Sequence, residues 1–415
     1  MRIGRRALLG ALGASALFVR RAWAADPAAA LRQMLDGLGA VPLAERPRAL
    51  AGFDPTRLDP SARLDLETVR RGVAIDAELA RLFPGGKAEA LPYKPAIGAG
   101  GVGAEGYRPL LERALGGAID PEALHRRFER EAAHLAGRAD PLLRGIGYSK
   151  GSLGERFRAF FRDPRWHYPD SDSGRDQAVA AMNRWLDTAR AQVSALIGTV
   201  PPLCLDVSAR RMARAEEAAG KAGYRVLPSP GQSGAYFVDL HDMARRPSWS
   251  LKSVVHHELL PGHMIQLPME AAARPHPLRL AYLAGFAEGW AIHAEAEMAR
   301  RGAYRGDAAG ELGHIHWLLF RVCRGLADTG MHLHGWSLAE ARARVAELQG
   351  EPAYFAPFDT DLPRIQADPA IRAAEAATWL VLRDVVARTR SDAGRHALYR
   401  RILTPGRGGI DTLGR

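Results

Sequence analysis

The chain has 415 residues, of which 47% are hydrophobic, 25% charged and 7% aromatic, and its formal net charge at pH 7 is +11. This composition is typical of globular proteins and excludes fibrous, disordered and multi-pass membrane proteins. Because the arginines are scattered along the chain without a dense basic block, we expect a solvated basic surface and no nucleic-acid partner.

Residues 1–24 have the features of an export signal. Arg5 and Arg6 precede the apolar run Ala7–Val19, which is too short to span a bilayer comfortably, and Ala22–Ala24 forms a small-x-small cleavage pattern. The arginine pair resembles a twin-arginine signal, with a Sec signal or an uncleaved anchor as the alternatives. We therefore expect a periplasmic or otherwise exported protein without stable membrane insertion after cleavage. Loss of the five arginines in this segment lowers the net charge from +11 to +6.

Residues 25–415 are predicted to form a single, mainly α-helical domain, with two lobes around a cleft as the alternative. The clearest strand pattern is Ala235–Leu240, and the glycine-rich stretch Gly98–Gly106 is predicted to be a loop that lacks the features of a phosphate-binding loop. From helical periodicity and start signals we predict helices over Ala28–Leu38, Pro60–Leu82, Pro121–Ala136, Ser173–Leu196, Ser208–Lys221, Leu251–Leu267, Pro277–Arg301, Gly310–His332, Ser337–Leu348 and Pro369–Arg390.

The string His257-Glu258, followed by a second histidine at His263, points to a zinc site. Zinc hydrolases bind the metal through imidazole nitrogens on an apolar helix, and a carboxylate beside the first ligand accepts a proton from the activated water. The usual spacing places the histidines four apart, about 40° around a helix. Here they are six apart, about 240° on a straight helix. Pro261 and Gly262 are therefore predicted to kink or bulge the helix and return His263 to the face of His257.

Glu288 is the predicted third zinc ligand, on a second helix. It lies among small and aromatic residues, a poor setting for a solvated carboxylate. The surrounding string A-E-G-W-A resembles the N-E-G-F-A element that carries this ligand in zinc aminopeptidases. Glu295 lies seven residues further along the same helix face, and it is the second choice of ligand or a partner to a zinc-bound histidine.

Several longer strings resemble the bacterial domain-of-unknown-function 885 family of metallopeptidase-like proteins. The resemblance implies a zincin-type helical fold with a small β element next to the active-site helix, and a peptidase-like activity. The HELLPGH motif also resembles the HELLGH motif of dipeptidyl peptidase III with one residue inserted. Members of the family commonly carry a downstream tyrosine and lysine, and Glu375 and Ala376 stand about where these belong. The matching strings are His257–Pro268, Glu288–Glu295, Ala327–Ser337, Asp120–Leu135 and Gly234–Leu240.

Some supporting residues have two interpretations. By resemblance, His332 is the candidate donor to the developing oxyanion, with a helix-end histidine as the alternative. Arg364 could hold a substrate carboxylate or be a surface charge. The strand Ala235–Leu240 could pair with a peptide at a sheet edge or lie in the core. Cys204 and Cys323 could form a disulfide or remain buried thiols. We interpret His314, His316, Trp290, Trp317 and Trp336 as packing residues, and His256 as either a packing residue or one that supports a metal ligand.

The leading hypothesis is zinc-dependent hydrolysis of peptide bonds, with Zn²⁺ bound by His257, His263 and Glu288, and with Glu258 as general base. The absence of the family's downstream tyrosine motivates a second hypothesis, an exported metal-binding pseudoenzyme. A third is a zinc hydrolase that acts on a non-peptide amide. The sequence leaves the substrate, the choice between exo- and endo-action and the oligomeric state open.

Overall fold

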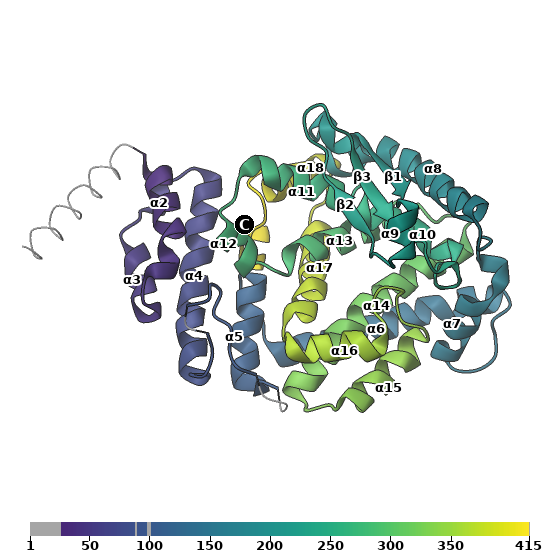
Figure 1. Ribbon diagram of the computed structural model, residues 1–415, viewed down its shortest axis with the longest axis horizontal. Coiled ribbons are helices and arrows are strands. Elements are labelled where there is room, and N and C mark those ends of the chain that lie inside the picture. Colours follow the sequence, from purple (N-terminus) through teal and green to yellow (C-terminus); the bar gives the residue numbers. More distant parts are fainter. Residues whose placement is uncertain (1–25, 88, 98–100, 415) are drawn as a thin grey trace, which may run out of the picture. The chain divides into compact units, whose positions relative to one another are not determined.

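The computed structural model describes residues 26–87, 89–97 and 101–414 (Figure 1). The predicted export signal, residues 1–24, lies outside the described residues. Within the described ranges, no helix is both long and apolar enough to cross a membrane. We predicted one domain with two lobes as the alternative, and the chain divides into two compact units. Among the described residues, one unit holds those up to residue 96 together with 274–282, and the other holds those of 97–273 and 283–414.

The smaller unit is built on one long helix whose ends match the prediction. Asp59 accepts hydrogen bonds from the amides of Ser61 and Ala62, and Pro60 follows it, so a cap and a proline start the helix together. The Tyr282 hydroxyl donates to Asp76 at 2.6 Å. The elements are α2 (Pro27–Asp36), α3 (Arg46–Ala51), α4 (Pro60–Leu82), α12 (Pro277–Tyr282) and the 3₁₀ turns Leu38–Ala40, Leu43–Glu45 and Pro55–Arg57.

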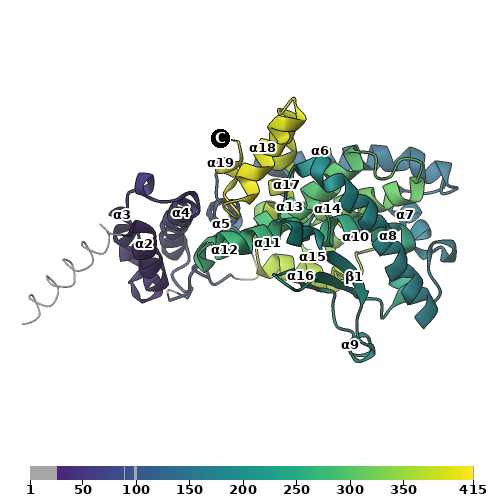
Figure 2. The ribbon, with the colours of Figure 1, turned by 90° about the horizontal axis from the view of Figure 1, so that it is seen from above.

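The larger unit is a helical assembly around α14 (Ala308–Leu333), which is buried along nearly its whole length. A helix that is buried on all sides must be covered by others. Helices α6, α10 and α17 pack along it, and α13 lies beside α17 (Figures 1 and 2). The other helices are α5 (Gly103–Leu115), α6 (Pro121–Gly145), α7 (Leu153–Arg162), α8 (Asp172–Ile197), α9 (Arg214–Ala218), α10 (Ser248–Glu258), α11 (His263–Ala273), α13 (Phe286–Arg300), α15 (Leu338–Gln349), α16 (Phe358–Ala367), α17 (Ile371–Ala387), α18 (Asp392–Leu403) and α19 (Ile410–Leu413).

A three-stranded sheet in the order β1-β3-β2 packs against α8. Strand β1 (Val207–Arg211) runs parallel to β3 (Gly234–Val238), and β2 (Tyr224–Val226) runs antiparallel to it. The prediction of a mainly α-helical fold with a small β element is therefore confirmed. The predicted strand is β3, but it lies in the middle of the sheet. A peptide cannot add to it as an edge strand, because both of its sides are already paired.

The helix predicted over Ser208–Lys221 is wrong. Its first residues form β1, and only α9 is helical. Val207 and Ala209 are buried on one side of the strand, and the backbone pairing with β3 outweighs the helical propensity of an alanine- and arginine-rich segment. Within the described part of Gly98–Gly106, α5 already begins at Gly103, so the predicted loop is too long.

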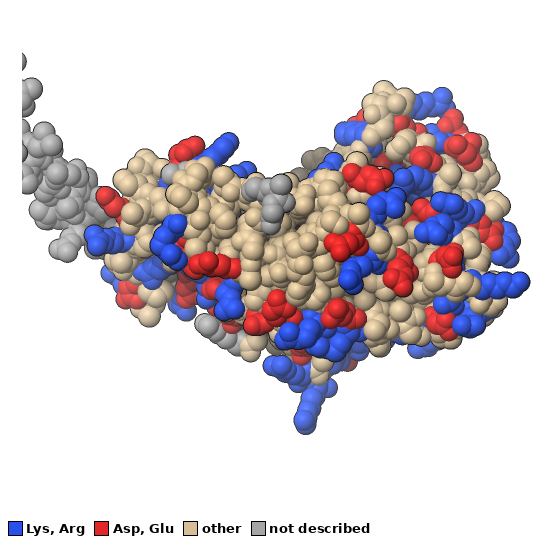
Figure 3. Space-filling view, turned by 90° about the horizontal axis from the view of Figure 1, so that it is seen from below, with Lys and Arg blue, Asp and Glu red and all other residues tan. Residues whose placement is uncertain are grey.

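Six of the described helices were not predicted from the sequence, namely α3, α5, α7, α16, α18 and α19. For α7 a signal was present, because Ser152 and Glu155 form a capping box at its start. On the face drawn in Figure 3, acidic and basic side chains are interspersed rather than gathered by sign.

Candidate metal centre

The two histidines of the motif lie on separate helices. We predicted one kinked or bulged helix, but α10 ends at Glu258 and α11 begins at His263. Leu259 leaves the helical region with φ −111° and ψ −107°, and Pro261, whose peptide bond is cis, has no amide hydrogen to continue the ladder. The helix is therefore completely interrupted between the two histidines.

Gly262 makes this break possible because the chain passes very close to the end of α10. A Cβ atom on residue 262 would lie 1.9 Å from the carbonyl oxygen of His257, so no larger residue fits without a backbone shift. The indole Nε1 of Trp290 donates to the carbonyl oxygen of Gly262 at 3.2 Å. This tryptophan, which we had interpreted as a packing residue, ties the turn to α13.

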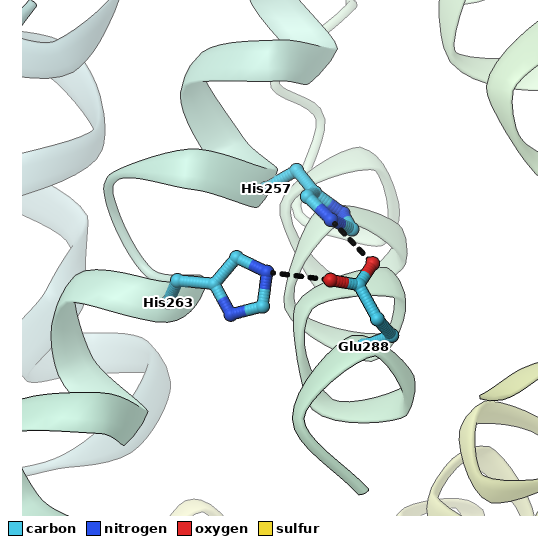
Figure 4. A group of neighbouring side chains, drawn as sticks. All are labelled: His257, His263 and Glu288. Carbon is cyan, nitrogen blue, oxygen red and sulfur yellow. Dashed lines mark hydrogen bonds and ion pairs between the residues drawn. The ribbon is translucent and has the colours of Figure 1, made fainter. Parts of the chain in front are cut away.

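The break brings His257 and His263 together with Glu288 (Figure 4). Nε2 of His257 lies 3.3 Å from one carboxylate oxygen of Glu288, and Nε2 of His263 lies 3.3 Å from the other. The two imidazole rings are 5.0 Å apart at an interplanar angle of 88°. Each of the three residues offers one ligand atom, and these atoms lie within 4.8 Å of one another.

Glu288 reaches the histidines from the start of α13. The segment predicted as one helix over Pro277–Arg301 is divided into α12 and α13, which places Glu288 in the first turn of α13. A carboxylate is favoured there by the helix dipole. The side chain of Glu288 is 30% exposed, whereas those of His257 and His263 are 6% and 1% exposed. The group therefore opens to solvent on the side of the carboxylate.

Glu295 lies behind His257 and is linked to a second histidine. One oxygen of Glu295 is 3.5 Å from Nδ1 of His257, and the other is 3.0 Å from Nδ1 of His314. Burial opposes ionisation of Glu295, but the two imidazoles lower its pKa to about 2. A carboxylate on Nδ1 leaves Nε2 of His257 to point toward Glu288. The sequence interpretation of His314 as a packing residue missed this contact.

The residues fit a zinc ion. Nε2 of His263 is buried and, apart from its ion pair with Glu288, has no polar partner among the described residues, so a metal ion could take its lone pair. The pKa of Glu288 is held well below its usual value by His257 and His263, although the protein around it removes part of its solvation and opposes this. Two imidazoles and one ionised carboxylate, with an open fourth position, form one of the common donor sets of catalytic zinc.

Two arginines that the sequence did not point to also contact this group. On α14, the guanidinium of Arg321 lies 3.2 Å from Nε2 of His257 and 3.3 Å from Glu288. Burial and Arg321 lower the pKa of His257, but the carboxylates of Glu288 and Glu295, which accept hydrogen bonds from the protonated ring, raise it to about 9. On β2, Arg225 donates to the carboxylate of Glu258. A cation therefore faces both the ligand group and the proposed base.

A cavity of about 290 Å³ opens beside the group and is lined by Glu258, Glu288 and Arg321. Tyr236 and Tyr354 also line it, and their hydroxyl oxygens lie 3.4 Å apart. Phenol hydroxyls are thus present at the site, although the sequence lacks the downstream tyrosine that the resemblance led us to look for.

Residues 30–370 match the family described as "Bacterial protein of unknown function (DUF885)". The chain belongs to this family. No curated protein matches the DUF885 chain.

Two solved structures share the fold of this DUF885 protein. A "putative lipoprotein" from Colwellia psychrerythraea has a TM-score of 0.67 at 21% identity, covering 93% of this chain and 68% of its own. A "putative lipoprotein of unknown function" from Shewanella oneidensis has a TM-score of 0.62 at 13% identity, covering 92% of this chain and 72% of its own. At these identities the likeness concerns the fold alone.

The structure does not bring His332 to the group formed by His257, His263 and Glu288 in the DUF885 chain. Nε2 of His332 lies 3.3 Å from the carbonyl oxygen of Ile365, and its ring stacks on Tyr107. Because His332 follows Arg321 by eleven residues on α14, it lies about 16 Å further along the helix axis. Asp328, one turn before it, accepts hydrogen bonds from the amides of Ala370 and Ala373 at the start of α17.

The remaining predicted residues are distributed as follows. Arg364 is exposed and lines the cavity. Glu375 is buried and pairs with Arg372. Cys204 and Cys323 are both buried free thiols.

Proposed function

We propose that this DUF885 protein is an exported, zinc-dependent hydrolase of peptide amide bonds with a zincin-type helical fold. The observation that carries the proposal is the convergence of His257, His263 and Glu288 across a broken helix. Their donor atoms would hold the ion, and Glu258, which follows the first ligand directly, would be the general base.

A bound zinc ion supplies Lewis acidity, which lowers the pKa of water and polarises a carbonyl. The chain supplies the rest. Glu258 accepts a proton from the attacking water and returns it to the leaving amine. Arg225 contacts the carboxylate of Glu258 and holds it in one orientation at the cavity wall. Glu295 fixes the ring of His257 through Nδ1.

We assign Arg321, in place of His332, as the donor to the oxyanion. Its guanidinium lies within hydrogen-bond distance of two ligand atoms and also lines the cavity. Negative charge that develops on a carbonyl oxygen at this point would meet a permanent cation, and such preorganised donors contribute strongly to amide hydrolysis.

The expected location is the periplasm or another exported compartment. The basic and apolar segment with its cleavage pattern in residues 1–24 supports this location. The lipoprotein descriptions of the two structural neighbours are consistent with export. The partner we expect is a peptide or another amide substrate.

Metal analysis of the purified full-length chain tests the proposal. The wild-type protein is expected to hold about one zinc per chain, and His263→Ala is expected to lose it. His241→Ala is a suitable control, because His241 is half exposed and pairs with Asp239. Zinc retained equally by the wild type and His263→Ala would refute the assignment of the site.

One observation favours a second candidate function, an exported metal-binding protein without peptide turnover. Arg225 already pairs with Glu258, and Arg321 already contacts two of the ligand atoms, so cations occupy the positions that catalysis needs free. Cleavage of a peptide library with and without a chelator separates the two functions. Chelator-sensitive products support the hydrolase, and full metal loading without products supports the binding protein.

A further inference from the structure

Five arginines line the cavity beside the proposed metal site. Guanidinium groups reach it from a strand and from three different helices, so segments far apart in the sequence bring the same charge to one place. The arginines in its lining are Arg225 on β2, Arg321 and Arg324 on α14, Arg364 on α16 and Arg372 on α17.

Two of these arginines form ion pairs with buried carboxylates. Arg324 makes two hydrogen bonds of 2.9 Å to Asp361, a bidentate arrangement, and lies 3.7 Å from Glu375. Arg372 also donates to Glu375. Both therefore have partners that orient them and neutralise much of their charge.

Arg225 and Arg321 each have one carboxylate partner. Arg225 contacts Glu258, and Arg321 lies 3.3 Å from Glu288. Nε of Arg321 is buried and finds no hydrogen-bond partner among the described residues. If Glu288 serves as a metal ligand, it shares its charge with the ion, and Arg321 is then less fully neutralised.

Arg364 has no carboxylate partner among the described residues. It is exposed at the cavity, whereas the other arginines of the lining are buried or half-buried. Five guanidinium groups thus face four carboxylates, and the excess positive charge is carried by the arginine that is most accessible to a ligand.

We propose that this cavity recognises a carboxylate of the substrate and that Arg364 binds it. A guanidinium matches a carboxylate with two parallel hydrogen bonds, and the surrounding arginines favour an anion over a neutral group. In a peptide the carboxylate comes either from the C-terminus or from an acidic side chain. The inference rests on the proposed function, because it makes acidic or C-terminal peptides the substrates of the same site.

The test measures binding of four short peptides to the full-length chain by calorimetry, first after treatment with a chelator. Ala-Ala-Ala with a free C-terminus is compared with its C-terminal amide, and Ala-Glu-Ala amide is compared with Ala-Gln-Ala amide. In at least one pair, the carboxylate peptide is expected to bind about ten-fold tighter than its neutral partner, the usual effect of a charge-assisted hydrogen bond. The pair that shows the difference identifies the source of the carboxylate.

Arg364→Gln is expected to remove this preference. Arg390→Gln is the matched control, since it removes the same charge from an exposed arginine outside the cavity lining, and it is expected to keep the preference. Equal affinities within both pairs would overturn the inference, as would an equal loss in the two variants.

Cleavage of the same peptides by the zinc-loaded chain separates the inference from the proposed function. Preferential binding without cleavage leaves carboxylate recognition standing and contradicts the hydrolase. Cleavage of all four peptides at similar kcat/KM supports the hydrolase and overturns carboxylate recognition.

Discussion

Gly262 lies directly under the carbonyl oxygen of His257, so closely that a Cβ atom would stand 1.9 Å from that oxygen. Gly262→Ala must therefore push the start of α11 away from the end of α10. Because a shift of about 1 Å at a reacting group costs on the order of 100-fold in rate, we expect this loss in turnover together with weaker metal binding. Metal content and kcat/KM of the purified variant provide the check.

Gly137→Ala is the control for this change. Gly137 lies within α6, and a Cβ there meets nothing within 4 Å. Alanine in a helix interior is favoured over glycine, so this variant should unfold at the same or a higher temperature and keep its metal. A normal metal content in Gly262→Ala would mean that the turn tolerates a side chain.

Substitution of Glu258 separates metal binding from proton transfer. Glu258 is not among the three ligands, and glutamine in Glu258→Gln has the shape of glutamate but cannot act as a base. We expect unchanged zinc content and a fall in kcat of about 100-fold or more, the usual contribution of a general base. Mass spectrometry of peptide products, with metal analysis on the same sample, measures both. Full activity in this variant would exclude Glu258 as the base.

Much of this group could be predicted from local patterns. The histidines and Glu258 lie within seven residues, and the small and aromatic neighbours of Glu288 argued against a fully solvated carboxylate. The start of α4 was predictable for the same reason, because Asp59 and Pro60 lie next to each other there.

The arginines at the site were not predictable, because their contacts are non-local. Arg225 reaches Glu258 across 33 residues, and Arg321 reaches His257 across 64. The periodic pattern of a single helix or strand carries no information about such a contact. The same limit explains the error over Ser208–Lys221, where pairing with β3 decides the structure of β1.

Glu295 is expected to control the affinity for metal without being a ligand. Its carboxylate faces Nδ1 of His257, and such partners typically contribute 10- to 100-fold to metal affinity. Glu295→Gln should weaken zinc binding by about this factor in a competition with a chelator of known affinity. Glu297→Gln is the matched control, a buried glutamate on the same helix that pairs with Arg300. Equal affinities in the two variants would contradict the positioning role.

Asp328 makes the stability of the larger unit depend on pH. Its complete burial raises its pKa from 3.8 to about 6, although the amides of Ala370 and Ala373 and the Tyr107 hydroxyl donate to it. Between pH 3.8 and about 6 this carboxyl is ionised in the unfolded chain but still protonated in the folded chain, so the free energy of unfolding falls as the pH rises. The total loss is about 3 kcal/mol, and no further loss from this group is expected above about pH 6.

Urea unfolding of the wild type and of Asp328→Asn across pH 4 to 7 measures this contribution. The difference between the two free energies of unfolding removes the effect of the other ionisable groups, and we expect it to change with pH in this window and to be flat above it. The amide should itself lower stability by about 1–3 kcal/mol, because it cannot accept all of the hydrogen bonds that the carboxylate accepts. A pH-independent difference would show that Asp328 keeps a normal pKa.

The donor to the oxyanion is decided by comparing Arg321 with His332. Arg321→Met keeps much of the side-chain volume but removes the cation that lies 3.2 Å from His257 and 3.3 Å from Glu288. If it stabilises the transition state, kcat should fall about 100-fold or more, as on loss of an oxyanion-hole donor. Zinc binding should be retained or strengthened, because a positive charge next to the ligands is removed.

His332→Gln should affect thermal stability, since the ring packs on Tyr107, but leave kcat within about two-fold because it lies about 16 Å further along α14. The opposite pattern, with turnover lost only in His332→Gln, would return the role to the histidine that the sequence first suggested.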